Sequence, residues 1–123
     1  MDNSNYKQAQ ILFKAWNELD SSLLKDWLSK DVIYESHWIV LPLIGKDSVI
    51  DFLSKKFETI KKHNLVPEVS LIQSDDNEYM VLVKLELEDE SSESIFRVSI
   101  RNRLISGISI IPIEMINIFH IVE

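Results

Sequence analysis

The residues of this chain that are best suited to acid–base chemistry lie close together, at positions 34–37. The His37 imidazole exchanges a proton near neutral pH, and Glu35, two positions away, would share its face of an extended strand. A carboxylate that orients a histidine makes a workable general base. The same alternation places Tyr34 and Ser36 on the opposite face, and only one face of a strand can line a cavity. Two interpretations of His37 therefore stay open: a catalytic base, or a histidine at the rim or surface.

Aromatic residues could supply the walls of a ligand pocket. The Tyr34 phenol could donate a hydrogen bond to a ligand oxygen, or it could pair with the backbone in the core. Trp16 and Trp38 offer flat apolar surfaces that suit a ring-bearing molecule. Trp16 also falls on a helical apolar stripe, where a core position is the alternative, and Trp38 could lie at the rim.

Two asparagines interrupt rows of apolar residues that would otherwise point inward. Asn102 falls in a row that includes Val98 and Ile100, and Asn117 falls in the row of the last expected strand. A buried amide without a hydrogen bond costs about 1–3 kcal/mol, so these amides either contact a ligand or lie near a strand end in water. The candidate ligand-binding residues are therefore Trp16, Tyr34, Ser36, Trp38, Asn102 and Asn117.

Several kinds of site are excluded by residue type and spacing. The chain has no cysteine for a thiolate site, and its two glycines cannot form a glycine-rich phosphate loop. No two of its three histidines are three or four positions apart, and no Gly-x-Ser-x-Gly motif occurs. We therefore expect neither a metal nor a cofactor.

The charge of the chain argues against nucleic acid as a partner. Its 13 basic and 20 acidic residues give a net charge of −7, which repels phosphates. A local basic cluster of Lys55, Lys56, Lys61 and Lys62 is interpreted as the exposed face of a helix. No apolar run reaches the ~18 residues of a membrane span, and residues 1–5 do not resemble a signal peptide. A cytoplasmic protein that does not contact a membrane is expected.

Hydrophobic periodicity predicts helices in the first half of the chain. Apolar residues at helical spacing predict a helix over residues 5–19. Asp20 could cap a second short helix that ends near Leu28. A third helix is expected after Gly45, ending near Lys62.

Strand patterns lie between and after these helices. Residues 31–38 have the composition of a strand, and Pro42 makes residues 39–44 an irregular segment or a short edge strand. Beyond the third helix the period becomes two, and this predicts strands at 66–74, 79–88, 94–105 and 108–121. The whole chain, residues 1–123, is expected to form one α+β domain.

Two turns set the expected pairing of the last three strands. A loop at Ser91-Ser92 would place Glu86 opposite Arg97, so that opposite charges meet. A tight turn at Ser106-Gly107 would start the last strand. A bulge or a kink is expected near Pro112, because proline cannot donate a ladder hydrogen bond.

An ordered set of short motifs in the first half of the chain carries a family resemblance. The motifs are Ala15-Trp16-Asn17-Glu18-Leu19-Asp20, Leu23-Leu24 through Trp27-Leu28, Asp31-Val32-Ile33-Tyr34-Glu35-Ser36, and Leu43-Ile44-Gly45-Lys46-Asp47-Ser48-Val49-Ile50-Asp51-Phe52-Leu53. The set resembles the SnoaL-like branch of the nuclear transport factor two-like (NTF2-like) superfamily. The resemblance covers residues 5–62 in pattern, and the later strands only in order and length.

This resemblance implies a cystatin-like cone, in which a strongly curved, mixed, mostly antiparallel sheet wraps around three helices and leaves an apolar pocket. Relatives include ketosteroid isomerases, polyketide cyclases, dehydratases and epoxide hydrolases, and others only bind or oligomerise. The enzymes often place a carboxylate base where this chain has Ser36, and the ketosteroid isomerases place a tyrosine near Leu12. Both groups are missing, so ketosteroid isomerisation is not expected.

The outer face of the sheet is expected to bind a second copy of the chain. Leu82, Ile95, Ile105, Ile108 and Ile110 would share that face with Arg97, Arg101 and Arg103. Such a surface is too apolar for free solvent, and many relatives dimerise there. A homodimer is therefore expected.

Three functions remain open. The first is a homodimer that binds a small apolar or aromatic molecule in an internal pocket and has no evident catalytic base. The second is a cofactor-free isomerase, cyclase or dehydratase that uses His37 with Tyr34 and Asn102. The third is a non-catalytic oligomerisation or interaction domain, with Leu41-Pro42-Leu43 as a contact.

Overall fold

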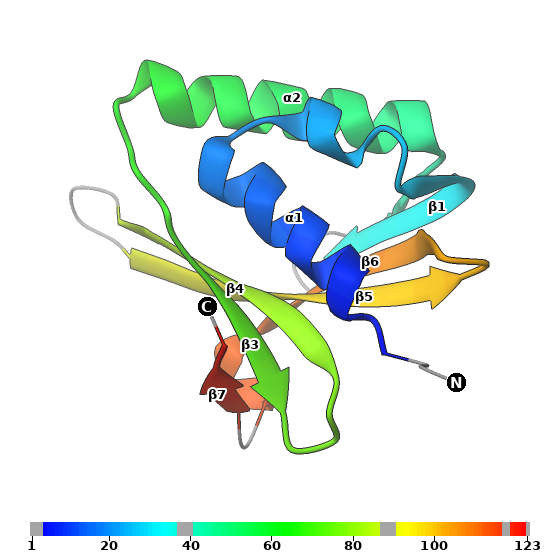
Figure 1. The fold of residues 1–123 in the computed structure, drawn as a ribbon. Coiled ribbons are helices and arrows are strands. Elements are labelled where there is room, and N and C mark those ends of the chain that lie inside the picture. Colours follow the sequence, from blue (N-terminus) through cyan, green and yellow to red (C-terminus); the bar gives the residue numbers. More distant parts are fainter. Residues whose placement is uncertain (1–3, 37–40, 87–90, 117–118, 123) are drawn as a thin grey trace.

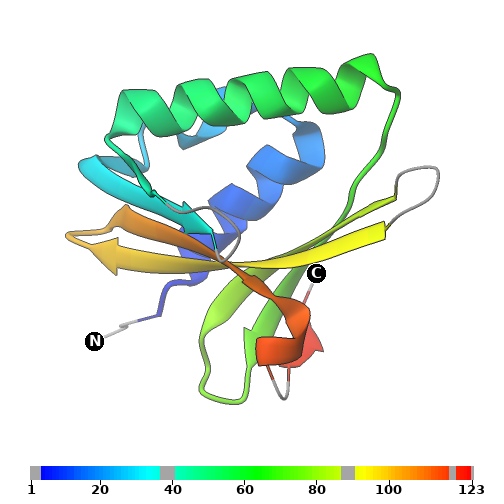
Figure 2. The ribbon, with the colours of Figure 1, turned by 180° about the vertical axis from the view of Figure 1, so that it is seen from behind.

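Two α-helices lie on one face of a seven-stranded sheet, and the C-terminal segment lies on the other face (Figures 1 and 2). The structure, a computed structural model, describes residues 4–36, 41–86, 91–116 and 119–122. The helices are α1 (Tyr6–Glu18) and α2 (Lys46–Lys62), with 3-10 turns η1 (Ser21–Leu24) and η2 (Ile113–Met115). The strands are β1 (Leu28–Ser36), β2 (Leu43–Ile44), β3 (Glu68–Ser74), β4 (Tyr79–Glu86), β5 (Ser91–Arg101), β6 (Leu104–Pro112) and β7 (Phe119–Ile121).

The second helix expected from the sequence is a single 3-10 turn, η1. Its cap is the expected one, because the Asp20 carboxylate accepts a hydrogen bond from the Ser22 N–H at 3.0 Å. The turn cannot extend, because the following residues join the sheet: the Trp27 carbonyl accepts from the Ile105 N–H at 2.7 Å, and Leu28 begins β1. The described chain therefore has two α-helices, not three.

The sheet is mixed and mostly antiparallel, as expected. Its strand order is β2-β1-β6-β5-β4-β3-β7, and only the β1–β6 pair of the described ladders is parallel. The short edge strand β2 confirms the interpretation of residues 39–44. Register shifts interrupt the β1–β6 and β5–β6 ladders, and such irregularities let a sheet bend around the elements it carries (Figure 1).

The turn between β5 and β6 differs from the prediction. It lies at Asn102 and Arg103, with φ values of 53° and 69°, so both residues adopt the left-handed conformation that two-residue hairpin turns require. The predicted turn at Ser106-Gly107 is wrong, since both residues belong to β6. The register shift lies at Ser99/Ile100 rather than at Pro112, and Pro112 ends β6 opposite Ser94.

The register of β4 with β5 also differs from the prediction, but the buried faces of the two strands were predicted correctly. Glu86 pairs with Ser91 instead of Arg97. Because the new register moves the partner by an even number of residues, Val83 and Phe96 still point to the same side as expected. Alternation therefore predicted the buried face correctly while the loop position was wrong.

The main core lies between the two helices and the sheet. Among its fully buried side chains are Trp16, Tyr34, Phe57 and Phe96. The Trp16 ring meets the Phe57 ring edge to face at 4.9 Å and lies tilted against Phe96 at 5.1 Å, arrangements that aromatic pairs prefer. These rings occupy much of the interior that the resemblance implies to be hollow.

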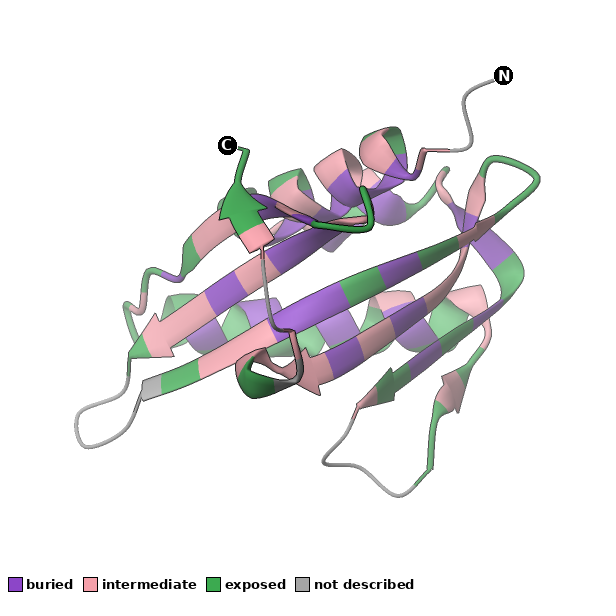
Figure 3. Cartoon of the chain, turned by 90° about the horizontal axis from the view of Figure 1, so that it is seen from below, coloured by how far each residue is buried: buried purple, intermediate pink, exposed green. Residues whose placement is uncertain are grey.

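A second, smaller core lies on the outer face of the sheet. Ile72, Met80 and Ile95 are completely buried there. Ile113 of η2 and Phe119 of β7 pack against this cluster. Figure 3 shows η2 and β7 on this side of the sheet. The chain thus covers part of its own outer face.

Several residues assigned to the outer face lie elsewhere. Ile105, Ile108 and Ile110 belong to the main core, because the earlier turn reverses the parity expected for β6. Arg97 pairs with Glu78 at 2.9 Å, and Arg101 pairs with Asp31 at 2.9 Å. The part of the outer surface that the structure describes is therefore less apolar than the sequence suggested.

Candidate functional site

A small cavity lies between the helices and the sheet, at the end of the core nearest the C-terminal half of α2. Its volume is about 120 Å³. Trp16 of α1, Lys56 of α2 and Ser36 of β1 line it. The remaining lining residues come from β4, β5 and β6: Val83, Leu85, Ser92, Ser94, Phe96 and Ile110. The cavity is thus apolar apart from serine hydroxyls and one amine.

A larger groove of about 480 Å³ adjoins this cavity along α2. Its apolar lining is Phe52, Ile60, Leu65 and Leu85. Its polar lining is Lys55, Lys56, Thr59 and His63. Lys56 and Leu85 line both hollows, so the groove lies against the cavity. The groove falls within the range of ~300–1,000 Å³ typical of ligand sites, whereas the cavity alone does not.

Two buried hydrogen-bond donors near this site have no partner among the described residues. One is the Trp16 indole N–H, whose ring lines the cavity, and the other is the Tyr34 hydroxyl. Tyr34 precedes Ser36 on the same face of β1, and its ring lies 5.3 Å from that of Phe52 in the groove. Burial raises the pKa of Tyr34, so its phenol stays protonated and can donate.

Lys56 is the charged side chain common to both hollows. Desolvation lowers the pKa of its amine, and the described chain offers it no ion pair. Its neighbour Lys55 differs, because its amine lies 3.1 Å from the Asp51 carboxylate one turn earlier. Among the described residues, therefore, no carboxylate pairs with the Lys56 amine.

The sequence predictions for individual site residues have mixed outcomes. Trp16 and Ser36 line the cavity, and Tyr34 lies beside it in the core. His37, Trp38 and Asn117 lie outside the residues that the structure describes. Whether His37 acts as a base therefore stays a prediction.

The placement of Asn102 in an inward row is wrong. It lies exposed in the β5–β6 turn, because β5 ends at Arg101. Ser94, which lines the cavity, is eight positions earlier on β5, and a strand rises ~3.3 Å per residue, so Asn102 lies roughly 25 Å along the strand from it. Asn102 and Tyr34 therefore cannot act on one ligand in this cavity.

Lys56, interpreted from the sequence as part of the exposed face of its helix, is exposed as expected, and it also lines both hollows, which the sequence analysis did not foresee. Phe52 and Ile60 lie four positions before and after it, so all three share one edge of α2. This spacing, with a lysine inside an apolar row, is the signal that could have identified it.

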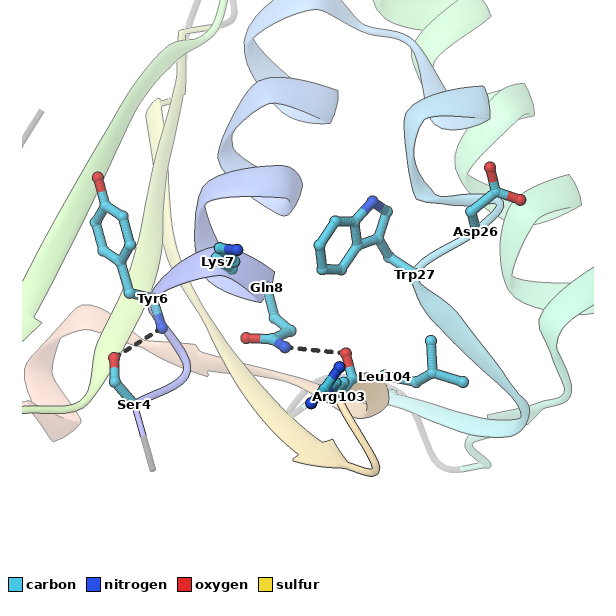
Figure 4. Close-up of a pocket in the computed structure, with 8 residues that line it drawn as sticks. All are labelled: Ser4, Tyr6, Lys7, Gln8, Asp26, Trp27, Arg103 and Leu104. Carbon is cyan, nitrogen blue, oxygen red and sulfur yellow. Dashed lines mark hydrogen bonds between the residues drawn. The ribbon is translucent and has the colours of Figure 1, made fainter. Parts of the chain in front are cut away.

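A third hollow of about 810 Å³ lies at the opposite end, between the start of α1 and the β5–β6 turn (Figure 4). There the buried Gln8 amide donates to the Arg103 carbonyl at 2.9 Å, while its oxygen has no partner among the described residues. Lys7, Asp26 and Arg103, all exposed, mix both charges around it. Although this hollow is larger, its mixed, exposed charges select no ligand class as clearly as the apolar site beside Lys56.

The described residues contain no group of three or more His, Asp or Glu side chains that could hold a metal ion. Neither α1 nor α2 combines the length and the apolar composition needed to cross a membrane.

Comparisons with known proteins identify the fold. No protein-family model and no curated protein matches the chain. An uncharacterized cystatin-fold protein from Novosphingobium aromaticivorans has a TM-score of 0.68 at 14% identity, covering 89% of this chain and 99% of that one. A de novo designed protein with a curved β-sheet has a TM-score of 0.67 at 20% identity, covering 89% of this chain and 86% of that one.

An NTF2-like protein of unknown function from Cytophaga hutchinsonii is also similar, with a TM-score of 0.65 at 8% identity over 90% of this chain and 91% of that one. These likenesses show that the chain has the cystatin-like, NTF2-like fold. They do not extend to function, since a designed protein has the same architecture.

Proposed function

We propose that this protein of NTF2-like fold binds a small apolar or aromatic molecule in the cavity beside Trp16 and the adjoining groove along α2. The observation that carries the proposal is that the two hollows are adjacent and share lining residues. Lys56 and Leu85 line both, so a molecule lying over Phe52 and Leu65 could extend toward the buried Trp16 ring. The unpartnered Trp16 N–H would then find an acceptor on that molecule.

The interior is smaller than the resemblance implied. Side chains fill most of it, so the ligand has to lie largely in the groove. Apolar walls with a few polar groups are typical of sites that hold small molecules, which favours binding.

The structure does not favour the alternative of a cofactor-free isomerase, cyclase or dehydratase, because one of its three proposed working residues lies away from the cavity. That alternative requires Asn102 beside Tyr34, and Asn102 lies in a distant turn. The interaction-domain alternative stays a prediction; Leu41 and Pro42 are both exposed.

The proposal is tested by closing the groove. Leu85→Arg would place a charged side chain where the two hollows meet. We expect 2-naphthol to bind the wild-type protein, measured by its fluorescence, and Leu85→Arg to weaken that binding at least tenfold.

Ile121→Arg is the matched control, because Ile121 is exposed on β7, on the other side of the sheet. It should bind 2-naphthol like the wild type. Equal binding by the wild type and Leu85→Arg, or no binding by the wild type, would refute the proposed function at this site.

The expected homodimer stays a prediction. The apolar cluster of the outer face is covered by η2 and β7, so a partner would have to contact a surface that includes this segment. Sedimentation equilibrium would decide between one and two copies.

A further inference from the structure

The described ionisable side chains that line the groove along α2 are all basic: Lys55, Lys56 and His63. The whole chain carries a net charge of −7, so a groove whose described lining has basic but no acidic side chains is unusual for its surface. Such an arrangement favours a negatively charged ligand group.

Among these side chains, Lys56 is the one placed to receive that group. The Lys55 amine is already paired with Asp51 at 3.1 Å. The His63 ring is hydrogen-bonded through Nδ1 to the Thr59 carbonyl at 2.9 Å. Lys56 has no such partner in the described part of the chain, and apolar residues surround its stem. A charge removed from water without a counter-charge is costly, and an anion in the groove would offset that cost.

The apolar part of the lining determines what the rest of the ligand must be. Phe52, Ile60, Leu65 and Leu85 offer no hydrogen-bonding side chains. A hydrophilic anion such as inorganic phosphate would leave this surface in water, whereas an alkyl chain or an aromatic ring would bury it. The groove volume of about 480 Å³ suits a molecule of small or medium size.

We propose that the ligand of this groove is an amphipathic carboxylate, an aliphatic or aryl acid whose carboxylate lies against the Lys56 amine and whose apolar body lies over Phe52 and Leu85. This inference rests on the proposed function and adds the charge of the ligand to it. The lowered pKa of Lys56 agrees with this placement, because its cause is the partial removal of the amine from water. The carboxylate supplies the missing charge.

The charge requirement is tested with three probes that have alkyl chains of similar length. Octanoate, 1-octanol and octyltrimethylammonium differ mainly in the charge and size of the head group. By isothermal titration calorimetry at pH 7, we expect the wild-type protein to bind octanoate at least tenfold more tightly than 1-octanol. Octyltrimethylammonium should bind more weakly than either.

Substitution of Lys56 separates the charge from the apolar contact. Lys56→Gln and Lys56→Met should each lose the preference for octanoate while still binding 1-octanol. Lys62→Gln removes a charge from the same helix outside the groove and should keep the preference. Circular dichroism of each variant checks that α2 is intact.

The outcomes distinguish this inference from the function on which it rests. Equal affinity of the wild type for octanoate and 1-octanol would overturn the carboxylate assignment and leave apolar binding standing. An unchanged octanoate preference in Lys56→Gln would overturn the role of Lys56. Failure of all three probes and of 2-naphthol would refute the proposed function itself.

Discussion

At the scale of single residues, the notable group is a lysine in apolar surroundings. Long side chains place their stems on apolar surface and keep the charged end in water when they can. At Lys56 the amine is partly removed from water, and this lowers its pKa below the ordinary 10.5. The protonated form is therefore less favourable in the folded protein than in the unfolded chain.

Replacing this lysine by an apolar residue should stabilise the protein. The cost of the charge is fully present below the folded-state pKa, and it disappears as the pH rises above 10.5. We expect Lys56→Met to raise the melting temperature at pH 7 by about 1–3 °C. The advantage should vanish near pH 11, and a pH-independent difference in differential scanning calorimetry would contradict this explanation.

At the scale of elements, α1 is attached to the sheet by one side chain at its start. Asn5 precedes α1 and does not cap it. Its amide nitrogen donates to the carbonyls of Tyr79 at 2.9 Å and Val98 at 3.1 Å, and its oxygen accepts from the Tyr79 N–H at 2.9 Å. These bonds connect the start of α1 with β4 and β5, and so help to hold Trp16, further along the helix, over the cavity.

Removing this connection should cost stability. Asn5→Ala deletes three hydrogen bonds and leaves backbone groups without partners, which should lower the free energy of unfolding by about 3 kcal/mol in urea titrations. Asn17→Ala, on the exposed side of α1, should change it by less than about 0.5 kcal/mol. A loss below about 1 kcal/mol for Asn5→Ala would show that packing alone positions the helix.

The faces of the strands could be predicted from the sequence, but the turns between them could not. The alternation of apolar residues identified the buried faces of β4 and β5. A shift of register by an even number of residues leaves every side chain on the same face of the sheet. The alternation could not locate the hairpin turn. Ser106-Gly107 and Asn102-Arg103 both offer a residue that tolerates positive φ, and only pairing with the remote β1 decides between them. Trp16 and Ser36, named from the pattern, line the cavity, and Lys56 lines it too although its exposed position on the helix, correctly predicted, gave no sign of this.

At the scale of the whole molecule, the C-terminal segment acts as a cover for the outer face of the sheet. Ile72, Met80 and Ile95 are buried by packing with η2 and β7. The Val122 N–H also donates to the Leu71 carbonyl at 2.7 Å, which fastens the end of this segment to β3. This apolar cluster on the side of the sheet opposite the helices is therefore covered within a single chain.

Detaching this cover should expose an apolar surface. Phe119→Asp would bury a charge in the outer cluster, so the segment should separate from the sheet. We expect 1-anilinonaphthalene-8-sulfonate fluorescence to rise severalfold and the protein to self-associate on size-exclusion chromatography. Ile121→Asp, with its side chain exposed on the same strand, should behave like the wild type. Unchanged dye fluorescence in Phe119→Asp would show that β7 does not protect the cluster.

The parallel pairing of β1 with β6 affects the order in which the strands can pair while the protein is being synthesised. The Glu35 carboxylate accepts a hydrogen bond from the Ser109 hydroxyl, 74 positions later in the chain. During synthesis, β1 therefore cannot pair with β6 until nearly all of the polypeptide has been made. During that interval the backbone edge of β1 that pairs with β6 has no partner strand, so nascent chains of this protein should depend on chaperones more than their small size would suggest.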